Sequence, residues 1–418
     1  MSADGPELVV VARGDAALRV TPSGLTSLAG YDTGRLNEIC DRYGGTMRPL
    51  FGASEERILR AAAQAPLHLD VPDLSVYYHV DAPADQLQDI AAMLLTQPLV
   101  AGAYVKPRPE LPTRTRSLPP QGVEPAAATP DFSGLQGHRG PAPGGVDVAR
   151  AWALHGGRGA GVRIIDIEQA WRFTHEDLIG NQGGVLDGTP SAALDARNHG
   201  TAVIGVIGGD DNGFGVTGIC PDANVSAISW RDKGIASAIH AAACRLGPGD
   251  IILVEVHAPG PRFNFTGRDD QLGYIAMEFW PDEFDAIRFA TRVRGVIVVE
   301  AAGNGAENLD DQLYDARPAP FPDHWRNPFR RGDRDSDAIL VGAGAPPPGT
   351  HDSNHGPDRS RLPFSNFGFA VDAQGWGEEV TTCGYGQLQL GANEDLFYTH
   401  RFNGTSSASP IIVGVLAC

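Results

Sequence analysis

Residues 161–166 read GVRIID and residues 296–304 read VIVVEAAGN, and in each a short run rich in Val and Ile leads into polar residues. Comparable runs alternate with helical stretches at 162–165, 225–228, 251–254, 296–299 and 339–341. Unbroken runs of this kind are typical of strands covered on both faces, and their alternation with helices indicates an α/β fold with a doubly wound parallel sheet. Functional residues in such sheets lie beyond the carboxyl ends of the strands. We therefore expect each chemical motif to follow a strand or to begin a helix.

The composition of the chain excludes two classes of partner. The 418 residues carry a formal net charge of -18, from 33 Lys and Arg against 51 Asp and Glu. A surface this acidic repels phosphates and anionic lipids, so we expect no nucleic acid and no membrane as partner. The five cysteines form no CxxC pair, which argues against a zinc site and favours buried free thiols.

The pattern of apolar residues and the proline content divide the chain into three segments. Residues 1–105 are expected to form a small α/β domain, because helical spacing of apolar residues around 36–43 and 87–94 flanks strand-like stretches at 7–13, 74–80 and 100–105. Two helices packed on one small sheet is the predicted result. Residues 106–145 are rich in Pro and poor in large apolar side chains, which predicts an extended or disordered linker. Residues 146–418 carry the alternating pattern of the large sheet.

The two ends of the chain give expectations about location and length. The N-terminal stretch has acids where a signal peptide needs Lys or Arg, and no stretch is long enough to span a bilayer. We therefore expect a cytoplasmic protein by default, with export only by another route. The apolar run PIIVGVLAC ends twelve residues after Ser406 and resembles the first part of a longer buried helix, which predicts a C-terminal truncation.

Four polar residues follow the strands or begin the helices of the predicted sheet. Asp166 ends the run GVRIID, Asn304 follows VIVVEAAG, His199 precedes an apolar helical stretch, and Ser406 lies in FNGTSSASP. Each of them taken alone is more simply a cap, a turn residue or a structural histidine. An aspartate, a histidine and a serine are nevertheless the residue types that nucleophilic catalysis requires, because a serine hydroxyl needs a base that takes its proton.

Taken together, these motifs resemble those of the subtilisin-like serine proteases. The runs IIDIE, HEDL, HGTAV, AAGN and GTSSASP are similar to the family's motifs, and they occur in its order of Asp, His, Asn and Ser. The resemblance covers about residues 146–418. It implies a triad of Asp166, His199 and Ser406, in which Asp166 orients the imidazole. It also implies that Asn304 and the backbone N–H of Ser406 bind the oxyanion, and that the chemistry requires no cofactor.

Three departures from the family concern the surroundings of the triad. Ile167 and Glu168 follow Asp166 where the family has Thr-Gly, and Ser407 replaces a methionine. The stretch VEVHAPG at 254–260 replaces the family's substrate-pairing Ser-Leu-Gly-Gly. The expected substrate-binding residues are Glu255, Val256 and His257, with Ala301, Ala302 and Gly303 as an edge that pairs with extended substrate. Glu255 and His257 either line a pocket or point away from it.

The resemblance also implies a structural calcium ion. In many subtilisins the Asp of His-x-Asp-Leu and a loop beyond the catalytic helix hold one calcium, and here these are Asp177 and the loop 210–216. The expected ligands are the side chains of Asp177 and Asn212 with the carbonyls of Asp210, Phe214 and Val216. A solvated acidic turn is the competing interpretation.

The N-terminal domain resembles the subtilisin propeptide, which is a ferredoxin-like α/β domain. As a propeptide it would block the active site as an intramolecular inhibitor until the linker is cleaved, whereas an unrelated α/β domain would never meet the groove. The predicted function is that of a serine endopeptidase that acts on proteins or peptides. The alternative is a non-catalytic protein-binding domain on a subtilisin scaffold.

Overall fold

The computed structural model describes residues 5–52, 56, 58, 60, 71–113, 128–180, 182–332 and 334–418. A seven-stranded sheet forms the centre of the larger domain, in the order β15-β14-β13-β10-β7-β9-β8, and its neighbouring strands pair in parallel. The strands are β7 Arg163–Glu168, β8 Gln182–Asp187, β9 Asn224–Ser229, β10 Ile251–Val254, β13 Ile297–Ala301, β14 Ile339–Gly344 and β15 Ala373–Trp376. The predicted doubly wound parallel sheet is confirmed, and β8 and β15 are its edge strands.

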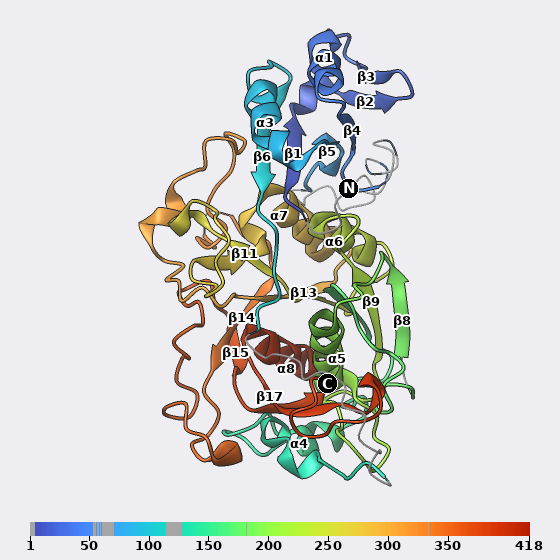
Figure 1. Ribbon diagram of the computed structural model, residues 1–418, viewed down its shortest axis with the longest axis vertical. Helices are drawn as coiled ribbons and strands as arrows, with labels where there is room; N and C mark the ends of the chain where they lie inside the picture. Colours follow the sequence, from blue (N-terminus) through green and yellow to red (C-terminus); the bar gives the residue numbers. More distant parts are fainter. Residues whose placement is uncertain are drawn as a thin grey trace.

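Helices cover both faces of this sheet, as Figure 1 shows. Helices α5 (Leu194–Gly208) and α8 (Thr405–Ala417) pack on one face, and α6 (Ile235–Ala243) and α7 (Pro281–Arg288) pack on the other. Successive residues of a strand point to opposite faces, so Ile164 packs under α5 and α8 whereas Ile165 packs under α6 and α7. This explains why the strands read as continuous apolar runs.

Shorter elements complete the larger domain. They are α4 Val148–Trp152, a π-helical turn Phe289–Val293 that extends α7, and two antiparallel pairs, β11 His257–Pro259 with β12 Tyr274–Ala276 and β16 Val380–Cys383 with β17 Tyr398–Phe402. None of the described helices combines the length and the apolarity that a bilayer span requires.

The N-terminal domain is a four-stranded antiparallel sheet in the order β4-β5-β1-β6 with two described helices on one face. Its elements are β1 Glu7–Ala12, α1 Gly34–Arg42, β4 Thr46–Pro49, β5 Tyr77–Asp81, α3 Leu87–Leu95 and β6 Val100–Lys106, with a hairpin of β2 Leu18–Thr21 and β3 Gly24–Ser27. The two predicted helices and the small sheet are present. The predicted strand at 74–80 begins only at Tyr77, because Asp73 accepts the Ser75 N–H and caps a short 3-10 turn at Leu74–Val76.

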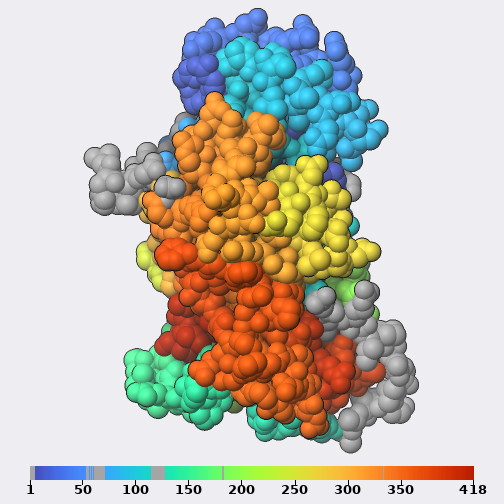
Figure 2. All heavy atoms as spheres, turned by 90° about the vertical axis from the view of Figure 1, so that its left-hand side faces the viewer, coloured from blue at the N-terminus to red at the C-terminus, as the bar shows by residue number. Residues whose placement is uncertain are grey.

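The other face of this small sheet lies on α6 and α7, so the N-terminal domain caps one end of the molecule (Figures 1 and 2). Polar contacts fix the docking at the acidic first turn of α7. Lys106 Nζ lies 2.5 Å from Asp282 Oδ2, contacts Glu283, and lies 3.0 Å from Glu7 Oε2. Tyr104 donates a hydrogen bond of 2.8 Å to Asp282 as well. The sheet is therefore held in one position on the larger domain.

The segment predicted as a linker is partly ordered. Strand β6 leads from the N-terminal domain toward the middle of the larger domain (Figure 1), and residues 107–113 continue along it. Residues 114–127 lie outside the described part. Residues 128–145 pack on the larger domain: the Phe132 N–H donates to Gly215 O, the Gly215 N–H to Pro130 O, and the Trp376 indole to Gly144 O. The predicted disorder is therefore wrong for 128–145, because backbone hydrogen bonds order a segment with few large apolar side chains.

The buried Lys106 gives a test of this docking. We expect Lys106→Ala to lower the free energy of unfolding by about 3–5 kcal/mol, because removing one partner leaves buried carboxylates without a counter-charge. Urea unfolding followed by circular dichroism measures it. Arg35→Ala, which breaks an exposed pair with Glu38 in the same domain, is the matched control and should change little. Equal effects of the two substitutions would contradict the buried cluster.

Candidate active site

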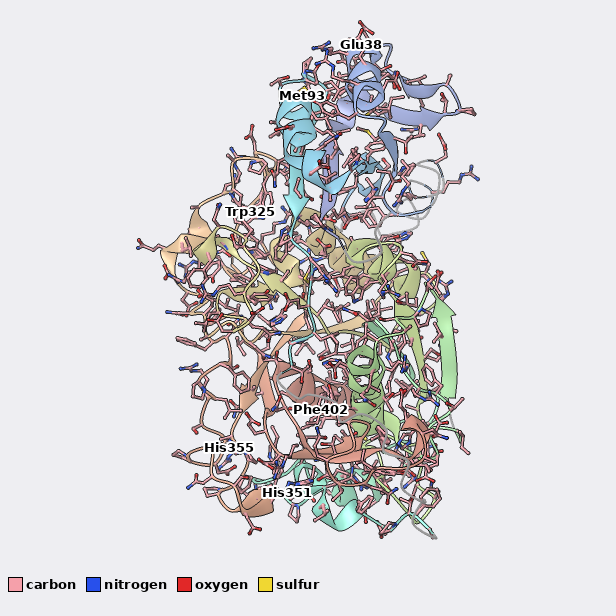
Figure 3. All side chains as sticks on the ribbon, in the orientation of Figure 1. Glu38, Met93, Trp325, His351, His355 and Phe402 are labelled. Carbon is pink, nitrogen blue, oxygen red and sulfur yellow. The ribbon has the colours of Figure 1, made fainter. Side chains whose placement is uncertain are left out.

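The acid that contacts His199 is Glu168. Strand β7 continues to Glu168, so that Asp166 and Glu168, two residues apart, point to the same face of the sheet, under α5. Glu168 Oε2 lies 2.6 Å from His199 Nδ1, and both side chains are fully buried. The ring of Phe402, labelled in Figure 3, packs against the imidazole at a centroid distance of 5.6 Å. The hydrogen bond thus fixes the orientation of the ring.

The predicted role of Asp166 as the partner of His199 is wrong. Asp166 Oδ2 accepts a hydrogen bond of 2.7 Å from the Trp171 indole, and its Oδ1 atom has no hydrogen-bond partner among the described residues. Burial, and then the charge of Glu168, raise the pKa of Asp166 well above its usual range. We infer that Asp166 keeps its proton. The physical reason for the correction is that the strand extends two residues further than the run GVRIID suggests.

His199 lies in the second turn of α5, since the helix begins at Leu194 and includes the polar residues before His-Gly-Thr. Burial lowers the pKa of His199 to about 4, so its imidazole is neutral at neutral pH. Among the described residues, no hydrogen-bond partner reaches its Nε2 atom. The free Nε2 lone pair can accept a proton.

Ser406 lies in the first turn of α8, as predicted. The N–H and hydroxyl of Thr405 both donate to Asn304 Oδ1, at 2.9 and 3.0 Å, and Asn304 Nδ2 donates to Gln271 Oε1 at 3.3 Å, so the amide group of Asn304 is held in one orientation. The neighbouring Ser407 is used differently, because its hydroxyl donates to Trp376 O and Gly404 O inside the core. Ser406 is therefore the serine of this motif that faces the groove.

Residues 110–112 of the same chain lie along His257 and Ser406, and we call this part of the site the groove. Glu110 pairs with His257 as an antiparallel bridge, with N···O distances of 2.9 and 3.1 Å. Two residues later, Pro112 O accepts hydrogen bonds from the Ser406 hydroxyl at 3.0 Å and from the Ser406 N–H at 3.4 Å. Gly404 permits this approach, since a Cβ there would collide with Pro112 O and lie 3.1 Å from Asn304 Nδ2. The Pro112 carbonyl oxygen thus lies against both the hydroxyl and the N–H of Ser406.

The side chains of the predicted substrate-binding residues 255–257 lie in three different surroundings. His257 presents its backbone to Glu110, and its ring packs on Tyr274, which donates a hydrogen bond of 2.7 Å from its hydroxyl to Glu110 Oε1. The side chain of Val256 is buried in the core. Glu255 is fully buried, and its Oε1 atom accepts a hydrogen bond from the Ser409 hydroxyl.

The predicted substrate edge at Ala301, Ala302 and Gly303 is wrong. Ala301 pairs with β14 within the sheet, the Ala302 N–H donates to Val341 O, and Gly303 O accepts the Asn366 N–H. These backbone groups are already used by the larger domain, because β13 is a central strand. The extended chain pairs with His257 instead.

The predicted calcium ligands do not fit a cation in this arrangement. Asp177 is fully buried, and its two carboxylate oxygens accept hydrogen bonds from Asn212 Nδ2 at 2.9 Å and the Val216 N–H at 2.6 Å. The Asp210 carboxylate accepts the Gly180 N–H. The loop, which includes Phe214, therefore directs N–H donors at Asp177, where a calcium ion needs oxygen atoms. Among the described residues, the one His and acid cluster tight enough for a metal is Glu168, His199 and Glu255, and its shortest contact is the Glu168–His199 hydrogen bond.

Sequence reasoning missed Glu168, Gln271, Tyr274 and Pro112. The two-residue period of a strand was a signal for Glu168, because it places this acid on the face of Asp166. Gln271, whose side chain donates to Leu111 O at 3.0 Å, follows no strand and carried no signal.

Part of this chain matches a known protein family. The subtilase family (Peptidase_S8) matches residues 178–418, a region that includes His199, Asn304 and Ser406 and begins after both acids of β7. The chain is 28% identical over 270 residues to alkaline elastase YaB of Bacillus sp. (strain YaB), which is 62% of this chain and 54% of that protein. It is 27% identical over 282 residues to subtilisin BL of Lederbergia lenta, which is 66% of this chain and 82% of that protein. This chain thus spans little more than half the length of alkaline elastase YaB.

Solved structures share the fold. Fervidolysin from Fervidobacterium pennivorans, described as a keratinolytic enzyme related to subtilisin, superimposes with a TM-score of 0.52 at 17% identity, over 99% of this chain and 54% of that one. The epidermin leader peptide processing serine protease (EpiP) from Staphylococcus aureus gives a TM-score of 0.52 at 15% identity, over 99% and 87%.

The Asp177 geometry gives a test of the calcium expectation. We expect the melting temperature to be the same in a chelator and in millimolar calcium, because N–H donors already fill the coordination positions of Asp177. Asp177→Ala should lower the melting temperature in both buffers, since it leaves the buried Val216 N–H without an acceptor. A rise of several degrees with calcium, lost in Asp177→Ala, would restore the predicted ion.

Proposed function

This chain belongs to the subtilase family, and we propose that it is a serine endopeptidase that hydrolyses peptide bonds through an acyl-enzyme on Ser406. One observation carries the proposal: a peptide carbonyl, that of Pro112, lies 3.0 Å from the Ser406 hydroxyl and within reach of the Ser406 N–H. The extended backbone around it pairs with the enzyme at His257, as a substrate would. Proteins or peptides are thus the proposed substrates.

The proposed reaction assigns one step to each group of the site. The Ser406 oxygen attacks the carbonyl carbon, and His199 Nε2 takes the hydroxyl proton and later gives it to the leaving amine. The Ser406 N–H and Asn304 Nδ2 stabilise the negative charge that develops on the carbonyl oxygen. Water then attacks the acyl-enzyme by the same route and releases the new carboxylate. For the attack, the Ser406 hydroxyl turns from Pro112 O toward Nε2.

Glu168 takes the place of the family's aspartate in this proposal. Its carboxylate holds His199 Nδ1–H at 2.6 Å and stabilises the imidazolium that forms during the reaction. Burial, and then the charge of Glu255, raise the pKa of Glu168 well above its usual range, and the neighbouring Asp166 acts against this rise. The sequence order of acid, histidine and serine is unchanged.

The N-terminal domain is the proposed intramolecular inhibitor. Its sheet is fixed on α6 and α7, its last strand β6 leads into the groove, and Pro112 lies at Ser406. We therefore assign Pro112–Thr113 as the bond that the protein cleaves in itself. Until the N-terminal domain dissociates, residues 110–112 exclude other substrates.

Self-cleavage at this bond is the first test. We expect the purified chain to yield an N-terminal fragment that ends at Pro112 and a second fragment that begins at Thr113, as measured by intact mass. Ser406→Ala should abolish the cleavage, and Ser407→Ala should leave most of it, since the Ser407 hydroxyl points into the core. Cleavage that persists in Ser406→Ala and stops in Ser407→Ala would mean that the nucleophile is wrongly assigned.

The two acids of β7 give the second test. Glu168→Gln should lower the self-cleavage rate by about 10⁴-fold, the size of loss seen when a triad acid becomes its amide. Asp166→Asn should keep the rate within a few-fold, because an amide is neutral, as a protonated Asp166 is, and its oxygen accepts the same hydrogen bond from the Trp171 indole. The reverse result would return the triad role to Asp166.

A further inference from the structure

Gln271 joins Asn304 to the peptide segment that lies in the groove. Its Oε1 atom accepts a hydrogen bond of 3.3 Å from Asn304 Nδ2, and its Nε2 atom donates one of 3.0 Å to Leu111 O. The partners fix the orientation of both amides, because Leu111 O can only accept and the Thr405 N–H can only donate to Asn304 Oδ1. One side chain therefore contacts both the proposed oxyanion donor and the peptide that is cleaved.

The hydrogen bonds of Asn304 leave one N–H unassigned. An asparagine amide has two acceptor positions on its oxygen and two N–H donors on its nitrogen. The N–H and hydroxyl of Thr405 fill the acceptor positions, and Gln271 Oε1 accepts one N–H. A Cβ on Gly404 would lie 2.1 Å from Pro112 O and 3.1 Å from Asn304 Nδ2, so this nitrogen lies near the carbonyl that reacts. Because the amide is planar, its other contacts determine the direction of the remaining N–H.

The carbonyl that Gln271 binds also contacts the bond proposed to be cleaved. Leu111 O accepts the Thr113 N–H at 2.9 Å, and this nitrogen belongs to the leaving amine of Pro112–Thr113. Gln271 Nε2 thus holds the carbonyl on which the amide of the cleaved bond is oriented.

The backbone of Gln271 has an unfavourable conformation. Its φ angle is +56°, in the left-handed region that glycine adopts freely and a glutamine rarely adopts. Hydrogen bonds maintain this turn, because the Gln271 N–H donates to Arg268 O at 3.0 Å and Gln271 O accepts the Tyr274 N–H at 3.2 Å. A glycine would fit the turn better and would lack the amide, so the strained backbone points to a function of the side chain.

We propose that Gln271 is a positioning residue of the endopeptidase, which orients the oxyanion donor of Asn304 and binds the peptide carbonyl one residue before the reacting carbonyl. The inference rests on the proposed endopeptidase function. As Ser406 attacks, negative charge forms on Pro112 O, and a donor stabilises it best when it already points at that oxygen. Because the same Gln271 amide binds Leu111 O, a peptide backbone in the groove and the orientation of the donor are coupled.

The experiment is a double-mutant cycle on the rate of self-cleavage at Pro112–Thr113. Cell-free translation supplies the full chain uncleaved, and intact mass follows the fragments. Gln271→Gly should lower the rate by about 10- to 100-fold, less than the roughly 10²–10³ expected for Asn304→Ala, because it misdirects the donor without removing it. In the Asn304→Ala background, Gln271→Gly should lower the rate only a few-fold, since only the contact with Leu111 O is then lost.

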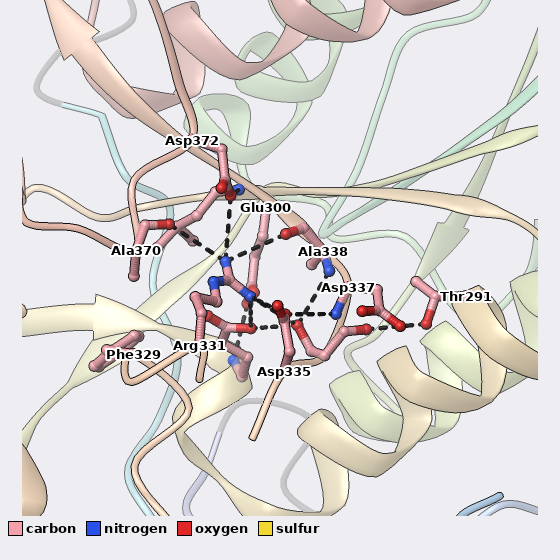
Figure 4. Close-up of polar contacts among 12 residues, drawn as sticks. Thr291, Glu300, Phe329, Arg331, Asp335, Asp337, Ala338, Ala370 and Asp372 are labelled. Atoms are coloured by element: carbon pink, nitrogen blue, oxygen red, sulfur yellow. Dashed lines mark hydrogen bonds and ion pairs between the residues drawn. The ribbon is translucent and has the colours of Figure 1, made fainter. Parts of the chain in front are cut away.

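The melting temperature separates positioning from a structural role, and Ser406→Ala keeps the chain intact for this measurement. Gln271→Gly should not lower the melting temperature, because glycine suits the left-handed backbone. Arg331→Ala is the control for stability. Its guanidinium pairs with Asp335 and Asp372 in the network of Figure 4, so its loss should lower the melting temperature and leave the cleavage rate within a few-fold.

Asn264→Gly is the matched control for the backbone. Asn264 is an exposed residue with a φ of +52° in the same connection between β11 and β12. Its replacement should leave the cleavage rate unchanged.

Two results would overturn the inference alone. One is a cleavage rate that Gln271→Gly leaves unchanged, and the other is an equal fold-loss in the wild-type and Asn304→Ala backgrounds, which would mean that Gln271 does not act through Asn304. If the wild-type chain does not cleave itself, the same cycle is measured as the rate of Ser406 labelling by a fluorophosphonate. A wild-type chain that neither cleaves itself nor takes up this label overturns the endopeptidase proposal and the inference with it.

Discussion

The active site depends on the buried hydrogen bond between Glu168 and His199. The parallel sheet brings the carboxyl ends of β7 and β10 together, and α5 and α8 cover that edge from the same side. An imidazole in this position has no water to orient it, so the 2.6 Å contact decides which nitrogen faces the groove. With Nδ1 engaged by the carboxylate, Nε2 is the atom left for the nucleophile. The sheet thus supplies the orientation that a solvated histidine would lack.

The same sheet determines where the chain's own peptide lies. Lys106 and Tyr104 fix the end of β6 on the acidic turn of α7, and from there six residues, 107–112, reach Ser406. Because Glu110 pairs with His257, the register places Pro112 two residues further, at Ser406. Proline lacks the N–H that an ordinary residue would present at this position, so the segment is held through Glu110 and Leu111 instead. The docked position of the N-terminal domain therefore also determines which peptide bond lies at Ser406.

The sequence predicted the fold better than the contacts within the site. Runs of Val and Ile are sufficient to place the central strands, because burial on both faces leaves few other residue types. The position at which a strand ends is harder to predict. If β7 ends two residues later than expected, Glu168 takes the place of Asp166 on the same face of the sheet. The calcium expectation has a related limit: the residue types at 210–216 suit oxygen ligation, but the sequence does not show that the backbone turns the Val216 N–H toward Asp177. The sequence does not reveal the order of the strands in the sheet. It therefore could not show that β13, which ends at Ala301, has neighbours on both sides and no free edge for a substrate.

The concentration of acids at this site has a consequence for folding. Desolvation raises the pKa of Asp166 and Glu255, so the folded chain binds more protons at these two carboxyls than the unfolded chain does. The stability that these protons provide is complete below the ordinary pKa and, for Glu255, is lost as the pH rises through about 8. His199 acts in the opposite direction, because its lowered pKa makes the fold less stable as the pH falls from 6.5 to about 4. Each of these groups therefore reduces stability over part of the pH range, and apolar residues of similar volume would avoid that cost. The site is retained for its chemistry, with the protons of its acids serving as part of its structure.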